Sequence, residues 1–266
     1  MKTTYALTIA GSDSGGGAGI QADLRAFHSQ GVFGLSVLTA ITAQNTTSVS
    51  AVHALPLSMI AAQFDAVLSD FDVCVAKTGM LGNGATVAEV TRLLVAAPQL
   101  KLVVDPVMIA SSGARLLDAE AELALRPLIA RATILTPNLP EAAVLLGIDE
   151  REIDLRAAAS SLLALGAEAV LLKGGHGSGD TLTDVYCDQF GVREYRTPRR
   201  AFRGHGTGCS LASLIAARLA LGDETAVAVA NAIAVFRRAI DHAAIVGRGE
   251  VLVPMPQPLE QSSLRR

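Results

Sequence analysis

Short apolar runs alternate with segments of helical periodicity along almost the whole chain, and this alternation limits the possible folds more than any other feature. The expected strands are Tyr5–Gly11, Leu35–Ala43, Val73–Lys77, Leu102–Val107, Thr133–Thr136 and Ala169–Leu172. The expected helices are Ile20–Gln30, Leu57–Leu68, Ala85–Ala96, Ala119–Ala130, Pro140–Leu146, Leu155–Leu165, Thr207–Leu219 and Thr225–Ala243. Nearly continuous apolar strands, each followed by a helix, are typical of a parallel sheet covered by helices on both faces.

The other segments fit a single α/β domain. Val185–Cys187 and Val192–Tyr195 predict a polar hairpin around Gly191. The sequence has no internal repeat and no linker, so we expect one domain over residues 1–266 with a loosely ordered tail over residues 255–266. Its central sheet should be mostly parallel, with helices on both faces. Ligands of such sheets bind at the carboxyl ends of the strands, so a site is expected in the loops that follow them.

Composition argues against several classes of function. The chain has 22 Lys and Arg against 25 Asp and Glu, and this net charge of −3 is not that of a typical nucleic-acid-binding protein. Mean hydropathy is +0.41, but the most apolar stretches (34–43 and 226–236) are too short or too polar to span a membrane. Cys74, Cys187 and Cys209 are odd in number and far apart. We therefore expect no disulfide framework and no zinc site, and a reducing cytoplasm fits best.

A glycine-rich loop, Gly11–Gly19, follows the first expected strand. It lacks the Gly-Lys-Ser/Thr sequence of a P-loop. A dinucleotide-binding loop would need an acidic residue about 20 positions later, where the second strand instead leads to Gln44. Two interpretations stay open: a flexible turn without a ligand, or a loop whose backbone amides approach a small substrate. In the second case the planar amide of Gln44 would suit a heteroaromatic amine.

A second glycine-rich segment, Gly204–Ser210, comes directly before an expected helix. Unobstructed N–H groups and the helix dipole make such a start suitable for an anion, including charge that develops on a phosphoryl group. The same field predicts a lowered pKa for the thiol of Cys209. The alternative is a closely packed turn of small residues in which Cys209 is simply buried.

Charged residues follow three further strands. Asp105 and Glu141 could hold a Mg²⁺ ion, which takes few protein carboxylates and binds mainly substrate phosphates. Equally, Asp105 could fix a turn and Glu141 could complement a helix N-terminus. Lys173 lies beside a glycine turn, where it could meet a phosphate or face solvent. Together with the expected anion site, these residues describe phosphoryl transfer, which depends on positioning and electrostatics.

Short motifs along the chain resemble those of the hydroxymethylpyrimidine/phosphomethylpyrimidine kinases of thiamine biosynthesis, which have the ribokinase-like fold. In family order they are Ala6–Asp13, Gly19–Asp23, Thr42–Thr46, Lys77–Leu81, Asp105–Met108, Thr136–Ala142, Leu172–His176 and His205–Cys209. The resemblance runs from about residue 5 to residue 245. It implies an ATP- and Mg²⁺-dependent kinase that acts on 4-amino-5-hydroxymethyl-2-methylpyrimidine and then on its monophosphate, commonly as a homodimer.

The resemblance also implies roles for individual residues. Gln44 matches the residue that binds the pyrimidine, and the other substrate positions are Gly11, Asp23, Met80 and Val107. The anion hole corresponds to Gly206, Thr207 and Gly208, and Cys209 takes the place of the aspartate base of related sugar kinases. Asp105 and Glu141 match the Mg²⁺ side, and nucleotide contacts fall to Lys173, Thr207 and Asn138.

Two positions depart from the family pattern. Ser111 lies in a stretch where relatives often carry Lys, and Arg203-Gly204 stands where they often carry Asn-Thr, so Arg203 could supply the missing cation for a phosphate. These changes bear most on the second phosphorylation step, whose substrate is charged. The alternatives are a pyridoxal-type kinase, whose substrate also carries a hydroxymethyl group on a heteroaromatic ring, and a non-catalytic pyrimidine-binding protein. The residues that contact adenine and the dimer interface are not apparent from the sequence.

Overall fold

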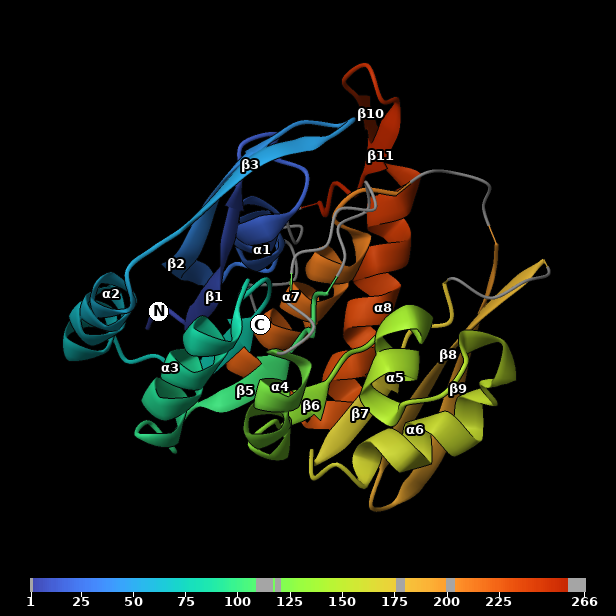
Figure 1. Ribbon diagram of the computed structural model, residues 1–266. Coiled ribbons are helices and arrows are strands. Elements are labelled where there is room, and N and C mark those ends of the chain that lie inside the picture. The colour runs from blue at the N-terminus through green and yellow to red at the C-terminus, as the bar shows by residue number, and fades with distance from the viewer. Residues whose placement is uncertain (1, 109–116, 118–120, 176–179, 200–203, 258–266) are drawn as a thin grey trace.

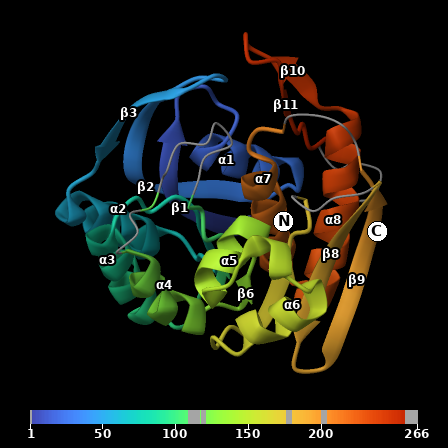
Figure 2. The same ribbon diagram turned by 45° about the vertical axis from the view of Figure 1, so that its right-hand side comes forward.

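The protein is built around one large sheet (Figures 1 and 2). The computed structural model describes residues 2–108, 117, 121–175, 180–199 and 204–257. Within these residues the sheet has nine strands in the order β3-β2-β1-β4-β5-β6-β7-β8-β9. The strands are β1 (Tyr5–Asp13), β2 (Phe33–Gln44), β3 (Val49–Ala54), β4 (Val75–Thr78), β5 (Lys101–Val104), β6 (Ile134–Leu135), β7 (Ala169–Leu172), β8 (Thr181–Asp188) and β9 (Gly191–Pro198).

The centre of the sheet is parallel and its two edges are antiparallel. β2, β1, β4, β5, β6 and β7 pair in parallel, whereas β3, β8 and β9 pair antiparallel with their neighbours. All residues of β4 and β7 are buried, as expected for parallel strands covered on both faces. The prediction of a mostly parallel α/β fold is confirmed.

Helices cover both faces of the sheet. They are α1 (Gly19–Ser29), α2 (Leu57–Asp70), α3 (Gly84–Val95), α4 (Ala121–Ala130), α5 (Leu139–Leu146), α6 (Leu155–Leu163), α7 (Thr207–Ala220) and α8 (Thr225–Asp241), with a short 3₁₀ helix at Glu150–Glu152. One core cluster joins α2 to α6 to the sheet, and a second joins α1, α7 and α8 to it. In Figure 1 the first group lies in front of the sheet and the second behind it.

The order of the strands places a crevice beside β1. The chain goes from β1 to β2 on one side and later reaches β4 on the other, so the connections diverge between β1 and β4. In open α/β sheets, ligands bind outside the carboxyl ends of the strands at such a point. The pairing of β1 with β2 also shifts by one residue between Ala10 and Ser12, where β1 reaches this crevice.

Several elements differ from the sequence-based expectation. β3 was not predicted because most of it is exposed, and its short sequence lacks a clear apolar alternation. β10 (Ala244–Val246) and β11 (Val251–Val253) form a separate two-stranded sheet and were not predicted either, since each is only three residues long. In the expected tail, Met255 N donates to Ala239 O at 3.2 Å, and residues 258–266 lie outside the described part. No described helix is both long and apolar enough to cross a lipid bilayer.

Candidate active site

A cleft of about 720 Å³ lies at the carboxyl ends of the parallel strands. It brings together almost all of the residues that the sequence singled out. Those that line it are Gly11, Gln44, Met80, Asp105, Val107, Asn138, Glu141, Lys173, Gly206, Thr207, Gly208 and Cys209. Residues far apart in the chain thus meet because their strands end side by side, and the start of α7 closes the same space.

Asp23 is the exception among the predicted residues. It was expected to line the substrate pocket, but its side chain is fully buried and does not border the cleft. Its carboxylate pairs with the ammonium group of Lys77, 3.0 Å from both oxygens, and accepts hydrogen bonds from Thr8 and Ser213 at 2.6 and 2.7 Å. Asp23 therefore lies beneath the site and does not contact a ligand in the cleft. Its carboxylate is in the core because it pairs with the charged side chain of Lys77.

The N-terminus of α7 is open to the cleft. Its N-cap, Gly206, has a positive φ of 69° and supplies no side-chain cap. A Cβ atom at Gly206 would lie 2.0 Å from the carbonyl oxygen of Gly17, so only glycine allows the two loops to approach this closely. The Nζ of Lys173 lies 3.2 Å from the position of a Cβ atom at Gly208. Backbone N–H groups and an ammonium group therefore face the same space, which suits a phosphate.

Lys173 does not face solvent, which was one of the two interpretations of its sequence position. Its side chain is 11% exposed, and its Nζ lies 2.9 Å from Asp105 Oδ1. Thr136 Oγ1 donates to the same oxygen at 3.3 Å. Burial lowers the pKa of Lys173, but the charges of Asp105 and Glu141 outweigh this and raise it above the ordinary value. Lys173 therefore presents a positive charge to the cleft.

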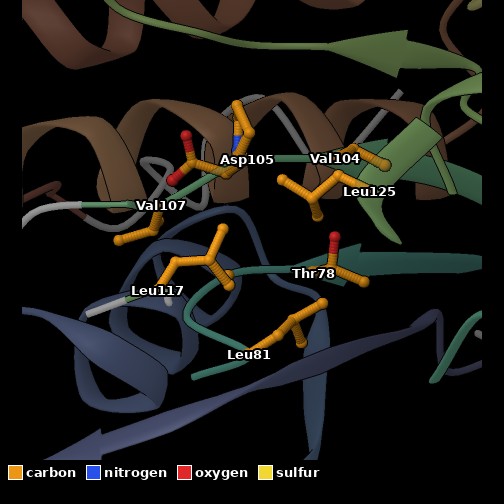
Figure 3. A pocket seen from close by; sticks show the side chains of 9 residues that line it. Thr78, Leu81, Val104, Asp105, Val107, Leu117 and Leu125 are labelled. Atoms are coloured by element: carbon orange, nitrogen blue, oxygen red, sulfur yellow. The ribbon is translucent and has the colours of Figure 1, made fainter. Parts of the chain in front are cut away.

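Asp105 and Glu141 face the cleft from neighbouring strand ends. Figure 3 shows Asp105 at the border of a small niche whose walls include Leu81, Leu117 and Leu125. Glu141 and Asn138 form a capping box at the start of α5, in which Glu141 Oε2 accepts from Asn138 N at 2.9 Å. Burial, together with the charge of Asp105, raises the pKa of Glu141 to about 7. The helix-capping interpretation of Glu141 is thus confirmed, and the carboxyl group still borders the cleft.

The glycine-rich loop after β1 is held by an internal carboxylate. Asp13 accepts hydrogen bonds from the backbone N–H groups of Gly15, Gly17 and Ala18 at 2.8, 3.1 and 2.8 Å. His205 Nε2 lies 2.9 Å from Asp13 Oδ2, and these donors lower the pKa of Asp13 although burial raises it. In one interpretation of this loop its backbone amides approach a substrate, and three of these amides already donate to Asp13. Whether the loop contacts a substrate or is a turn without a ligand stays a prediction.

Burial determines the acidity of Cys209. The position at the start of α7 predicted a lowered pKa, but burial raises the pKa of the thiol to about 12. The positive charges of Lys77 and Lys173 act in the other direction and do not compensate, and the nearby carboxylates of Asp105 and Asp23 add to the rise. The thiol is therefore protonated at neutral pH in the free protein.

Gln44 ends β2 and borders the cleft. Its side-chain oxygen accepts a hydrogen bond from Thr42 Oγ1 at 3.3 Å. Among the described residues, none holds its amide nitrogen. Met80 is buried beside Gly11, where its Sδ lies 3.0 Å from the position of a Cβ atom. A planar polar group and an apolar wall are thus available to a small ring.

Several functional positions were not apparent from the sequence. Asp13 and His205 come from opposite ends of the chain, so only the fold reveals that they pair. Lys77 also borders the cleft, as does an apolar region formed by Leu182, Ile233, Phe236 and Ile240. The signal that could have pointed to Lys77 is a lysine inside an otherwise apolar strand, since buried lysines are rare unless paired.

Asp184, on β8, is another buried carboxyl group at the cleft. It accepts a hydrogen bond from Gly174 N at 2.9 Å and is 8% exposed. Burial raises its pKa from 3.8 to about 6, against the opposing effects of that hydrogen bond and of the charge of Lys173. The folded protein therefore takes up this proton at a higher pH than the unfolded chain does. Stability from this group rises as the pH falls from about 6 towards 4, and the charged form is a cost above that window.

We expect Asp184→Asn, which resembles the protonated form, to be more stable than the wild type at pH 8 by up to about 3 kcal/mol. The difference should shrink towards zero near pH 4 as the wild-type carboxyl group is protonated. Urea unfolding of both proteins at pH 4.5 and pH 8 measures this effect. Asp72→Asn is the control, since Asp72 is 80% exposed and its exchange should change stability little at either pH. Equal stabilities of Asp184→Asn and wild type at pH 8 would contradict the prediction.

Comparisons with known sequences agree with this geometry. Residues 13–254 match the family described as phosphomethylpyrimidine kinase. The chain is 44% identical over 251 residues to the hydroxymethylpyrimidine/phosphomethylpyrimidine kinase of Haemophilus influenzae, covering 91% of this chain and 93% of that protein. It is also 46% identical over 246 residues to the thiamine biosynthesis bifunctional protein ThiED of Geobacter sulfurreducens, where the match covers 91% of this chain. The chain spans about half of that longer relative, since 50% of it is covered.

Solved structures give the same result. The ADP complex of Bacillus subtilis pyridoxal kinase superposes with a TM-score of 0.86 at 33% identity, covering 99% of both chains. The phosphomethylpyrimidine kinase of Clostridium difficile superposes with a TM-score of 0.77 at 39% identity, covering 88% of this chain and 100% of that one. Ser111, His176 and Arg203 lie outside the described residues, so the predictions made for Ser111 and Arg203 stay predictions.

Proposed function

Because the chain belongs to the phosphomethylpyrimidine kinase family, we propose that it phosphorylates 4-amino-5-hydroxymethyl-2-methylpyrimidine with ATP and then phosphorylates the monophosphate. The chain is a kinase of thiamine biosynthesis with a ribokinase-like fold. The observation that carries the proposal is the shared cleft: Gln44 lies at one wall and the start of α7 at another, around about 720 Å³ of space. A ring and a transferring phosphoryl group can therefore occupy one cavity.

Each wall of the cleft has a distinct role in this proposal. Gln44 binds the polar edge of the pyrimidine, and Gly11, Met80 and Val107 form the surface against which the ring packs. This arrangement directs the hydroxymethyl group towards Cys209. The hydroxyl oxygen then attacks the γ-phosphorus of ATP, and the bond to the ADP oxygen breaks.

The start of α7 stabilises the charge that develops during transfer. The N–H groups of Gly206, Thr207 and Gly208 donate to the phosphoryl oxygens, and the ammonium group of Lys173 adds a full positive charge. Asn138 and Thr207 contribute contacts to the nucleotide. The thiolate form of Cys209 accepts the proton of the substrate hydroxyl. Because the thiol is protonated in the free protein, it must first release its own proton to water.

The carboxylates present fit a magnesium ion. Asp105 and Glu141 both border the cleft, and burial, to which repulsion from the charge of Asp105 adds, raises the pKa of Glu141. A divalent cation relieves this repulsion, and two carboxylates with substrate phosphates are an ordinary Mg²⁺ environment. Asp105 and Glu141 would hold the ion, which supplies charge neutralisation for the phosphates when bound. Lys173 remains beside Asp105 and adds a positive charge for the phosphates.

The direct test is an ADP-release assay with the pyrimidine alcohol, its monophosphate and pyridoxine as separate acceptors. We expect turnover with both pyrimidines, loss of turnover with excess EDTA, and at least about tenfold lower kcat/KM with pyridoxine, since one mismatched polar contact costs about 1.4 kcal/mol or more. Recovery with Mg²⁺ but not Ca²⁺ controls for chelator effects on the fold.

Other outcomes of this assay decide between the alternatives. Preference for pyridoxine would favour the pyridoxal-type kinase, to which the similarity of the solved pyridoxal kinases gives some support. Binding of the pyrimidine without ADP release would favour the non-catalytic alternative. Turnover with the alcohol alone would indicate that the second step has been lost.

We further propose that the kinase is a cytoplasmic homodimer. The outer edge of the sheet supports the association of two copies, since β3 is exposed over nearly its whole length and Val52 is 48% exposed. The three cysteines are free, which fits a reducing compartment. Light scattering of the purified protein gives the oligomeric state directly.

A further inference from the structure

A buried ion pair lies beneath the cleft and is not used by the proposed mechanism. Lys77, on β4, and Asp23, on α1, are both 0% exposed. Lys77 nevertheless borders the cleft, whereas Asp23 lies behind it. The pair is fixed from several elements: Thr8 of β1 and Ser213 of α7 donate to the carboxylate, and Gly79 leaves room for the ammonium group, 2.8 Å from the position of its Cβ.

The stability of the fold does not by itself explain why a buried ion pair is present here. Removing two charges from water costs about as much as their attraction returns, and apolar residues of similar size often stabilise a core equally well. A cation kept at the wall of a cleft is instead available to any negative charge that forms there. Lys77 is on the strand beside which the chain connections diverge, where ligands of this fold class bind.

The group on which we expect the charge of Lys77 to act is the thiol of Cys209. Cys209 and Ser213 are four residues apart on α7 and so lie on the same face of the helix, and Ser213 reaches the ion pair directly. Lys77 and Cys209 both border the cleft, and the positive charge of Lys77 acts to lower the pKa of the thiol. The other charged groups that act on the thiol are Asp23 from α1, Asp105 after β5 and Lys173 after β7.

We propose that Lys77 is a positioning residue whose buried ammonium group stabilises the thiolate form of Cys209, and that Asp23 limits this effect by neutralising Lys77. Lys77 acts through the thiol and does not contact the substrate. The meaning of this pair for catalysis rests on the proposed function, but the reactivity of the thiol does not, because it can be measured without substrate or nucleotide.

The test is the rate at which iodoacetamide alkylates Cys209, followed by peptide mass spectrometry at several pH values between 7 and 9. Only the thiolate reacts, so at a pH far below the pKa a tenfold change in rate corresponds to one unit of pKa. Exposed Cys74 in the same molecule is the internal reference for the reagent. Three variants are compared in one background: Asp23→Asn, Asp23→Asn/Lys77→Met and Asp23→Asn/Lys77→Arg.

We expect Asp23→Asn to react at least about threefold faster than the wild type, because Lys77 is no longer neutralised. Asp23→Asn/Lys77→Met should react at least about tenfold more slowly than Asp23→Asn, because the cation is gone and no unpaired carboxylate remains. Asp23→Asn/Lys77→Arg, which keeps the charge, should stay within about threefold of Asp23→Asn. If the pair had only a structural role, the alkylation rate would not rise when the charge of Asp23 is removed and fall when the charge of Lys77 is removed as well.

Two results would overturn the inference. One is an equal Cys209-to-Cys74 rate ratio in Asp23→Asn and Asp23→Asn/Lys77→Met. The other is an Arg variant that is as slow as the Met variant. Wild-type kinase activity can be absent and the alkylation result still stands, so a failure of the proposed function is distinguishable from a failure of this inference. Thermal unfolding of each variant, followed by circular dichroism, verifies that all of the compared proteins are folded.

Discussion

Cys209→Ala is expected to lower kcat by about 100-fold or more while the KM for the pyrimidine stays within about threefold. The thiol borders the cleft at the start of α7, and in the proposed mechanism it accepts the proton of the substrate hydroxyl. Alanine removes that acceptor but leaves the N–H groups of Gly206–Gly208 and the ammonium group of Lys173 in place. Binding should therefore survive, and the loss should appear in turnover. Steady-state kinetics with the pyrimidine alcohol at saturating ATP measure both parameters.

Cys74→Ala is the matched control for this experiment. Cys74 is exposed, comes directly before β4 and does not border the cleft, and its sulfur makes weak contacts with the carbonyl oxygens of Tyr5 and Ala220. Its exchange should leave kcat and KM unchanged. If Cys209→Ala keeps a kcat close to that of the wild type, the amides and Lys173 carry the reaction without a protein base. That outcome is chemically reasonable for a loose phosphoryl-transfer transition state, so the measurement decides the point.

Gly206→Ala should reduce kcat/KM by more than about 100-fold and also destabilise the fold. The new Cβ would lie 2.0 Å from the carbonyl oxygen of Gly17, and backbone atoms cannot yield as a flexible side chain does. The positive φ of 69° adds about 1 kcal/mol of strain for alanine. The loop and the helix start must then separate, which moves the N–H groups away from the phosphoryl group. Kinetics and thermal unfolding together measure the two effects.

Gly31→Ala is the control that separates the effect of backbone strain from the effect of a steric clash like that between Gly206→Ala and Gly17. Gly31 has nearly the same φ, 72°, but a Cβ atom there would meet nothing within 4 Å. This variant should lose about 1 kcal/mol of stability and keep its activity. Similar activity losses in Gly206→Ala and Gly31→Ala would show that strain at a positive φ, and not the contact with Gly17, is responsible.

The fold was largely predictable because parallel strands are buried on both faces. Such strands leave apolar runs that are visible in the sequence, and Ala169–Leu172 was predicted with its observed bounds. Exposed strands at the edge of a sheet do not produce such apolar runs. β3 is mostly exposed, and its polar and small residues resemble a loop until a partner strand is known. The hairpin of β8 and β9 was located correctly but is longer than its apolar residues alone indicate.

The site was predictable where a residue acts from its own strand end, and not where it acts through a distant partner. Lys173 was placed at the cleft by its position after a strand. Asp23 was not, because the ammonium group of Lys77, on another strand, decides that its carboxylate is buried. The acidity of Cys209 was predicted in the wrong direction because the helix start is visible in the sequence, whereas the burial of the thiol depends on the packed structure.

Asp13 has a consequence for the energetics of the catalytic cycle. Its carboxylate already occupies the N–H groups of Gly15, Gly17 and Ala18, and Arg25 donates to the carbonyl oxygen of Gly16 from the helix behind. A segment rich in glycine would otherwise lose much conformational entropy each time a guest molecule arrived. Here that loss occurs once, during folding. Successive turnovers therefore begin from a wall that is already rigid, and the free energy of association remains available for the chemistry.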